Sequence, residues 1–281
     1  MTIKDNALTP PASSPGASAL AGTAEHRPER PEKTTDAVRL TEVSKSYGTG
    51  RTELLALDAV SLTVRDGEFV CIIGASGCGK STLLNVVAGL DKPTAGRVET
   101  GGRRIGLMFQ EPALFPWLTA GRNVELALQA RGVPKAARRA QVVELLDAVR
   151  LSGFAGKRPH ELSGGMRQRV ALARALAQDA DVLLMDEPFG ALDAMTRDLL
   201  HDELERICAD RTLTVLFVTH NVREAARLGD RVIVLSSRPG RVIEEYQLPR
   251  RGPRRIDSPE VAQLAGALTD RLREEMGRHG S

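Results

Sequence analysis

One stretch constrains the fold of this 281-residue chain more than any other, Gly74-Ala75-Ser76-Gly77-Cys78-Gly79-Lys80-Ser81. It fits the phosphate-loop pattern G-x-x-x-x-G-K-[ST] at every fixed position, between a strand pattern at 68–73 and a helical pattern at 81–90. The glycines let the backbone approach an oligophosphate, and the N–H groups and positive end of the helix attract its charge. Lys80 can reach the terminal phosphates, and the Ser81 hydroxyl can ligate Mg²⁺. A glycine-rich turn that serves packing alone is the alternative, but the Lys-Ser pair and both flanking elements favour a nucleoside triphosphate site.

Composition limits the class of protein around this site. An apolar fraction of 42% is enough for a core, and a net charge of +3 is too small to indicate a nucleic-acid partner. Cys71, Cys78 and Cys208 form no metal-ligand spacing and leave an odd number, which suits a reducing cytoplasm. No apolar run approaches the roughly 18 residues that span a bilayer, and the N-terminus lacks a signal-peptide pattern. We expect a globular chain that is soluble or peripheral to a membrane.

Strand and helix patterns alternate along the chain after residue 36. Residues 1–36 are rich in Pro, Ala, Ser and Thr and are expected to form a disordered tail. Further strand patterns fall at 38–43, 56–64, 97–99, 105–110, 181–186, 213–219 and 231–235. Helical patterns fall at 119–179 (with breaks at 132–134, 153–159 and 163–165), 194–209, 222–228 and 259–276. This alternation predicts an α/β fold with a largely parallel sheet covered on both faces and a helical block inserted into it.

Two further segments carry residues suited to phosphate chemistry. The apolar pattern 182–186 ends in Asp186 and Glu187, and successive strand-end residues point different ways, so one acid can serve a metal and the other the attacking water. If this pair stood alone, a solvated turn or helix cap would be the favoured interpretation. Leu162-Ser163-Gly164-Gly165-Met166 begins a helix with a capping hydroxyl and free N–H groups, which makes a second anion-binding helix end. Tyr47 lies on an upstream loop, where it either stacks on a base or is an ordinary loop residue.

Together these segments resemble the ATP-binding cassette (ABC) ATPases of ABC transporters, whose motifs occur here in the family's order between about Val38 and Leu248. The resemblance implies an α/β P-loop ATPase core with a mainly parallel sheet, an antiparallel β subdomain and an inserted helical subdomain at about 111–179. It also implies a cassette over 37–248, followed by a basic linker and a C-terminal helix at 249–281.

The same resemblance assigns roles to individual residues. Those implied in catalysis are Lys80, Gln110, Glu187 and His220. Those implied at bound ATP are Tyr47, the loop from Gly74 to Ser81, Thr82, Ser163, Gly164, Gly165 and Asp193. Those implied at Mg²⁺ are Ser81, Gln110 and Asp186. In this family two cassettes face each other head to tail, so residues 163–165 of one chain close over the ATP held by the other.

The kind of transporter is also suggested by resemblance. A lone cassette implies separate membrane subunits, as in bacterial importers, and segments 110–119 and 189–197 are similar to the importer branch for nitrate, aliphatic sulfonates and taurine. The expected partners are a second copy of the chain or a paired cassette, integral membrane permeases and, indirectly, a substrate-binding protein, at the cytoplasmic face of the membrane. An exporter ATPase and a non-transport ABC ATPase are the alternatives.

Two features of the sequence each have two possible interpretations. Three of the nine aromatic residues fall between Phe109 and Trp117, where the family receives a helix of the permease, and packing inside the helical block is the other interpretation. Cys78 lies at a helix N-terminus inside the phosphate loop, so it is either a low-pKa thiol that ATP protects or a small residue at a variable position.

Overall fold

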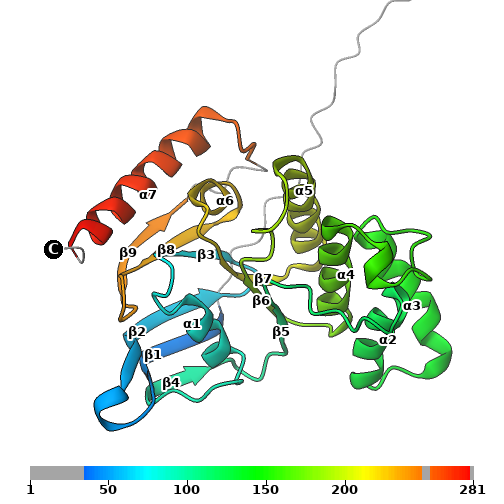
Figure 1. Ribbon diagram of the computed structural model, residues 1–281, viewed down its shortest axis with the longest axis horizontal. Helices are drawn as coiled ribbons and strands as arrows, with labels where there is room; N and C mark the ends of the chain where they lie inside the picture. Colours follow the sequence, from blue (N-terminus) through cyan, green and yellow to red (C-terminus); the bar gives the residue numbers. More distant parts are fainter. Residues whose placement is uncertain (1–34, 249–253, 279–281) are drawn as a thin grey trace, which may run out of the picture. The chain divides into compact units, whose positions relative to one another are not determined.

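A computed structural model describes residues 35–248 and 254–278 of the chain (Figure 1). The disordered tail expected at 1–36 lies outside the described residues, apart from its last two positions, and so does most of the basic linker that begins at residue 249.

Six strands form one mixed sheet in the order β5-β6-β7-β3-β8-β9 (Figure 1). Their bounds are β3 (Phe69–Ile73), β5 (Ile105–Met108), β6 (Val182–Asp186), β7 (Thr214–Val218), β8 (Arg231–Leu235) and β9 (Val242–Gln247). The first five strands of this order run parallel, and β9 is antiparallel to β8. In this register Cys71 of β3 lies beside Phe217 of β7 and Val232 of β8. The predicted mainly parallel sheet is confirmed.

A second, three-stranded sheet has the order β2-β1-β4 and is antiparallel throughout. Its strands are β1 (Asp36–Tyr47), β2 (Leu54–Arg65) and β4 (Ala95–Glu99), with a short 3₁₀ turn, η1 (Gly50–Thr52), between the first two. It is the antiparallel β region that the resemblance implied.

The core has two layers because alternate strand residues point to opposite faces of the six-stranded sheet. Phe69, Cys71 and Ile73 of β3 belong to one buried cluster, which they share with apolar residues of α2 to α7. Val70 and Ile72 belong to a second cluster, together with α1 and the antiparallel sheet. Both faces of the central strands are therefore covered, which explains why β3, β7 and β8 are buried at every position.

The described residues contain seven α-helices, of which α2 and α3 lie beside α4 and away from the sheets (Figure 1). They are α1 (Lys80–Val87), α2 (Ala120–Ala130), α3 (Lys135–Ala148), α4 (Gly164–Ala177), α5 (Ala194–Arg211), α6 (Val222–Leu228) and α7 (Pro259–Arg278), with a 3₁₀ turn η2 (Pro159–Glu161) before α4. Helices α2, α3 and α4 pack on one another and form the predicted helical block. Side-chain N-caps at Thr119, Ser163, Asp193 and Asn221 fix where four of the helices begin.

Strand β9 and helix α1 differ from the sequence expectation. Strand β9 has no counterpart among the predicted strands, because its sequence Val-Ile-Glu-Glu-Tyr-Gln does not alternate and it pairs with β8 alone, as the sheet's edge strand. Helix α1 was predicted to continue to residue 90 but ends at Val87, since Gly89 adopts a left-handed φ of +70°. Within the described residues no helix combines the length and apolar character that crossing a membrane requires.

Candidate active site

The predicted phosphate-site residues of one chain gather at one edge of the six-stranded sheet. The loop at 74–81 follows β3, Gln110 follows β5, Asp186 ends β6, and His220 follows β7. These four strands are parallel neighbours, so their carboxyl ends meet at the same edge. Four segments far apart in the sequence are thereby brought together.

The phosphate loop depends on glycine at the point where it becomes a helix. Gly79 has a φ of +106°, and a Cβ there would lie 2.7 Å from the Ala56 carbonyl oxygen. Any other residue would be strained and would clash with backbone. Lys80 is buried, and its ammonium donates to the carbonyl oxygens of Gly74 at 2.9 Å and Ala75 at 3.0 Å. The loop therefore curves around the lysine and holds its charge at the centre of the curve.

Ser81 and Asp186 form a pair of oxygen ligands beside this loop. Burial raises the pKa of the Asp186 carboxyl, and a hydrogen bond from the Ser81 hydroxyl opposes that rise. The neighbouring Glu187 charge raises the pKa further, while Lys80 lowers it. A hydroxyl and one carboxylate, completed by phosphate oxygens, is the set that Mg²⁺ takes in nucleotide sites. No cluster of three or more His, Cys, Asp or Glu with metal-binding geometry occurs in the described part of the chain, so Ser81 and Asp186 fit a metal only in such a shared site.

Glu187 and His220 form the second pair at this edge. The imidazole Nδ1 lies 2.9 Å from the Glu187 Oε2, and the His220 side chain is exposed. Glu187 adopts a φ of +42°, a left-handed conformation that costs energy for a residue with a side chain. Its backbone N–H donates to the Val218 carbonyl oxygen of β7 at 2.9 Å, which holds the strained turn in place. The turn aims the carboxylate across the strand ends at the histidine.

Tyr47 is not on a loop, as the sequence suggested, but is the last residue of strand β1, beside Thr82 in the first turn of α1. Its hydroxyl donates to the Asp91 carboxylate at 2.8 Å, and the Lys45 ammonium lies 4.9 Å from the ring centroid. Burial raises the pKa of Tyr47, and a hydrogen bond with Thr82 opposes the rise. The ring is thus fixed next to Thr82, which is one of the residues implied at bound ATP.

Gln110 is held through its backbone by a residue that the sequence interpretation missed. Gln168 of α4 donates from Nε2 to the Gln110 carbonyl oxygen at 2.9 Å and also to the Pro188 carbonyl oxygen. Gln168 is almost fully buried. A polar residue on the buried face of α4 was the available signal, because buried amides need partners.

The segment Ser163–Gly165 faces a different neighbour. Ser163 caps α4 by accepting from the Met166 N–H at 3.2 Å. A Cβ on Gly165 would lie 2.4 Å from the Thr196 methyl carbon, so only glycine fits against the start of α5. Asp193 caps α5, and the Thr196 N–H and hydroxyl that it accepts lower the pKa of its carboxyl.

The phosphate loop and the Ser163–Gly165 segment are built on separate parts of the fold. Helix α1 packs against β2, β6 and β7, whereas α4 packs against α2, α3, α5 and β5. Among the described residues, no hydrogen bond joins residues 163–165 to the phosphate loop. The structure of one chain therefore unites the loop with Gln110, Asp186, Glu187 and His220, and leaves Ser163–Gly165 beside Asp193.

Cys78 does not have the environment of a reactive thiol. It is buried, and this burial raises the pKa of its thiol, although the neighbouring Lys80 opposes the rise. The interpretation of Cys78 as a low-pKa thiol is wrong for this conformation. The other interpretation, in which Cys78 is a small residue packed inside the loop, fits the structure.

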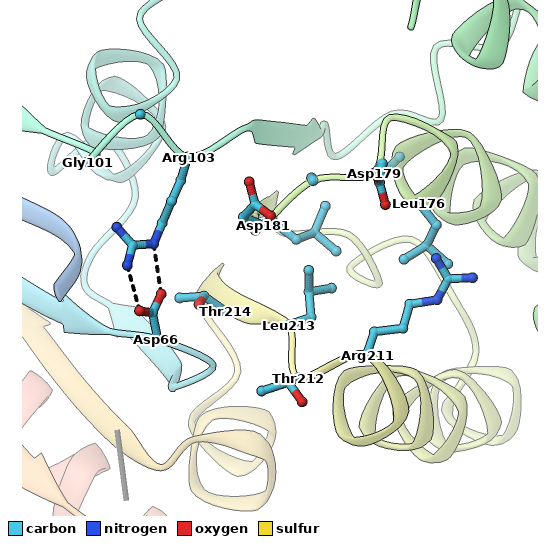
Figure 2. A pocket seen from close by; sticks show the side chains of 14 residues that line it. Asp66, Gly101, Arg103, Leu176, Asp179, Asp181, Arg211, Thr212, Leu213 and Thr214 are labelled. Atoms are coloured by element: carbon cyan, nitrogen blue, oxygen red, sulfur yellow. Dashed lines mark hydrogen bonds and ion pairs between the residues drawn. The ribbon is translucent and has the colours of Figure 1, made fainter. Parts of the chain in front are cut away.

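A cavity of about 680 Å³ lies at the opposite edge of the sheet, where β5, β6 and β7 begin. Figure 2 shows Arg103 facing Asp66, to which it donates from Nε at 2.8 Å and from Nη2 at 2.5 Å. Asp181 accepts from the Arg104 N–H at 2.9 Å. None of the residues expected at ATP lines this cavity, so the hollow and the predicted chemistry lie at opposite ends of the strands.

Comparison with known proteins gives a consistent result. The family described as ABC transporter matches residues 57–190. An uncharacterized ABC transporter ATP-binding protein of Methanocaldococcus jannaschii is 41% identical over 246 residues, which cover 85% of this chain and 92% of that protein. A taurine import ATP-binding protein of Roseobacter denitrificans is 47% identical over 69% of this chain and 75% of its own. An aliphatic sulfonates import ATP-binding protein of Mesorhizobium japonicum is 45% identical, with coverage of 82% and 86%.

The solved structures point to the same family. A dimeric ATP-binding cassette in a post-hydrolysis state, bound to ADP and phosphate, superposes with a TM-score of 0.68. It is 38% identical in sequence and covers 76% of this chain and 100% of its own. The fold, the gathering of motif residues at one sheet edge and these relatives together show that the chain belongs to the ABC transporter family of ATP-binding proteins and is an ABC-type ATPase.

Proposed function

We propose that ATP hydrolysis takes place at the carboxyl edge of the sheet with Glu187 as the general base. The observation that carries this assignment is the 2.9 Å contact between Glu187 Oε2 and His220 Nδ1, beside the Ser81–Asp186 pair and the phosphate loop. A carboxylate in this place accepts a proton from the attacking water. His220 orients that carboxylate and contacts the terminal phosphate.

The remaining residues at this edge hold the nucleotide. Lys80 and the loop N–H groups bind the phosphates, Thr82 adds a hydroxyl, and Tyr47 stacks on the base. Ser81 and Asp186 would hold Mg²⁺, with Gln110 as its sensor, and the metal would offset charge on the transferred phosphoryl group. Lys80 donates to loop carbonyls here, and we expect phosphate oxygens to take over those hydrogen bonds.

A second copy of the chain completes the site in this proposal. Its Ser163, Gly164 and Gly165 present a hydroxyl and a helix N-terminus to the phosphates, and Asp193 lies at the boundary between the copies. Two observations support this. Within the described part of the chain, residues 163–165 have no hydrogen bond to the phosphate loop, and the solved cassette to which the chain is similar is a dimer. ATP bound between two copies would hold them together until hydrolysis.

We further propose that the ATPase drives an importer through separate permease subunits. Relatives named as taurine, aliphatic sulfonate and bicarbonate transport proteins support solutes of this type. Three aromatic side chains near Gln110 are exposed: Phe109, Phe115 and Trp117, the last of them 69% exposed. They offer an apolar surface for a permease helix. The chain would act at the cytoplasmic membrane face as a cassette over 37–248, with a helical subdomain at 111–179 and an extension at 249–281, and with a substrate-binding protein across the membrane.

Two measurements test these proposals separately. Purified chain should hydrolyse ATP only with Mg²⁺, and Asp186→Asn should lose this Mg²⁺-dependent activity. Affinity purification of the tagged chain from solubilised native membranes should recover a multi-span permease, and a substrate-binding protein with it would fix the direction as import. Recovery of ribosomal or DNA-associated proteins alone would contradict the transport assignment and leave the ATPase intact.

A further inference from the structure

A buried carboxylate, Glu224, lies directly behind the proposed catalytic pair. It occupies the first turn of α6 and is only 3% exposed. None of the motif roles given above includes it. A buried ionised group is costly unless it is paired and hydrogen-bonded, so the contacts of Glu224 define what it holds in place.

The first contact reaches the residue before the histidine. The Thr219 hydroxyl donates to Glu224 Oε2 at 2.5 Å and accepts from the Asn221 N–H at 3.0 Å. His220 therefore lies between two residues that are both tied to one hydroxyl. The position of its backbone follows the position of the Glu224 carboxylate.

The second contact reaches the loop on the other side of the site. Arg197 Nε lies 3.4 Å from Glu224 Oε1 and donates to the Phe189 carbonyl oxygen at 3.3 Å. Arg197 Nη2 donates to the Leu192 carbonyl oxygen at 2.7 Å. The guanidinium thus joins Glu224 to the turn that connects Glu187 to Asp193.

The third contact is His201 of α5. Its Nε2 lies 3.6 Å from Glu224 Oε1, and its ring packs edge-on against Phe189 with centroids 5.4 Å apart. Burial alone would raise the pKa of Glu224, but His201, Thr219 and Arg197 outweigh it, so the pKa lies below its usual range. The carboxylate is ionised at neutral pH, accepts a hydrogen bond from the Thr219 hydroxyl and forms an ion pair with Arg197.

We propose that Glu224 is a positioning residue that couples the 187–193 loop to His220 through Arg197 and Thr219. The inference rests on the proposed function, since it assigns His220 a role in turnover. When a second copy displaces the Asp193 loop, Arg197 moves with the loop carbonyls, and the shared carboxylate transmits the shift to the strand end that carries His220. The 2.9 Å contact between Glu187 and His220 therefore depends on the position of the loop.

The test compares Glu224→Gln with a matched control in the full-length chain. Glu68 is also a buried glutamate, 2% exposed, and pairs with Arg231 at 3.2 Å, but it lies at the opposite end of β3 and β8. Glu224→Gln should lower kcat about ten-fold with the KM for ATP within about two-fold, the pattern of a lost transition-state contact. Glu68→Gln should lower the melting temperature and keep kcat.

A spectroscopic readout separates positioning from a general loss of stability. In ¹³C-histidine-labelled chain the His220 imidazole signal, assigned by its loss in His220→Ala, should shift in Glu224→Gln and stay in place in Glu68→Gln. Thr219→Val should reproduce the loss of kcat seen in Glu224→Gln. Thr219→Ser should keep wild-type activity, because serine retains the hydroxyl that contacts the carboxylate.

The outcomes distinguish the inference from the function on which it rests. If His220→Ala retains wild-type turnover, the role of His220 in the proposed function is wrong. If His220→Ala is inactive but Glu224→Gln and Thr219→Val turn over normally with an unshifted His220 signal, the coupling role of Glu224 is wrong. Equal losses of kcat in Glu224→Gln and Glu68→Gln also contradict it.

Discussion

The two edges of the six-stranded sheet carry similar residues in opposite arrangements. At the amino edge, buried Glu68 contacts Arg231, and Asp66 contacts Arg103, so each carboxylate has a fixed guanidinium partner. At the carboxyl edge the structure pairs neither Asp186 nor Glu187 with a lysine or arginine among the described residues. The carboxylates named at the amino edge are thus neutralised by arginine, whereas Asp186 and Glu187 have no lysine or arginine partner in the described part of the chain.

The difference shows how one sheet separates stability from chemistry. Glu187 holds a left-handed backbone, and burial raises the pKa of Asp186, so both residues cost stability where they lie. The cavity of about 680 Å³ is at the amino edge, where carboxylates are already paired. The cavity therefore lies away from the motif residues, whereas backbone strain at Glu187 and the raised pKa of Asp186 occur at the edge that carries them.

The largest effect should follow a change at the carboxyl edge. Glu187→Gln keeps the size of the side chain but removes the base, so kcat should fall about 1000-fold, within the range for general-base catalysis. ATP binding should persist, and ATP should trap a dimer that size-exclusion chromatography detects. Glu99→Gln, at an exposed position on β4, is the control. Undiminished hydrolysis in Glu187→Gln would remove Glu187 from its role.

A change at the amino edge should show the reverse pattern. Glu68→Ala leaves Arg231 without its buried partner, which costs about 3 kcal/mol of unfolding free energy in comparable buried pairs. Activity per folded molecule should stay near wild type because no residue of the proposed site touches this pair. Denaturant unfolding and a steady-state ATPase assay measure both quantities. A large loss of kcat with unchanged stability would break the contrast between the edges.

Asp186→Asn should sharpen the contrast because it should abolish ATPase activity and raise the melting temperature. A carboxyl whose pKa is raised in the folded state binds its proton more tightly there than in the unfolded state. Its contribution to the free energy of unfolding therefore falls as the pH rises above 3.8, the ordinary pKa of an aspartate. The uncharged amide removes that loss, and the melting temperature of nucleotide-free protein at pH 7 should rise by about 2–4 °C. The gain should shrink toward pH 4. A lower melting temperature at pH 7 would mean that the buried charge is stabilising.

The smallest effect concerns the loop thiol. All three cysteines are buried, so native chain should react with maleimide far more slowly than chain unfolded in urea. Mass spectrometry of the modified peptides identifies the site. Rapid labelling of Cys78 that Mg-ATP prevents would restore the reactive-thiol interpretation.

Sequence patterns predicted most of this architecture because its strands are strongly apolar and its turns carry clear signals. Helix α6 and strand β8 begin and end where the pattern placed them. Strand β9 was not predicted, because an edge strand can form without an alternating apolar pattern. The residues that meet at the carboxyl edge were implied by the family resemblance, and the strand order that brings them together is seen in the structure.

The residues behind the site could not be predicted in the same way. Gln168, Arg197 and Glu224 act through contacts between elements that are distant in the sequence, and each reads as an ordinary polar residue on a helix. Only packing shows that Glu224 is buried, and which groups Glu224 and Gln168 contact. Local pattern therefore identifies groups that touch substrate more readily than groups that position them.

The central claim is that an ATP site is shared between two copies of the chain, and mixing two inactive variants tests it most directly. Lys80→Ala removes the phosphate-loop lysine, and Ser163→Arg blocks the segment that the second copy contributes. In an equal mixture half of the dimers contain both variants, and each of these has one intact site, so about a quarter of the wild-type ATPase rate should return. A mixture that stays inactive although the two chains co-purify as a dimer would contradict the shared site.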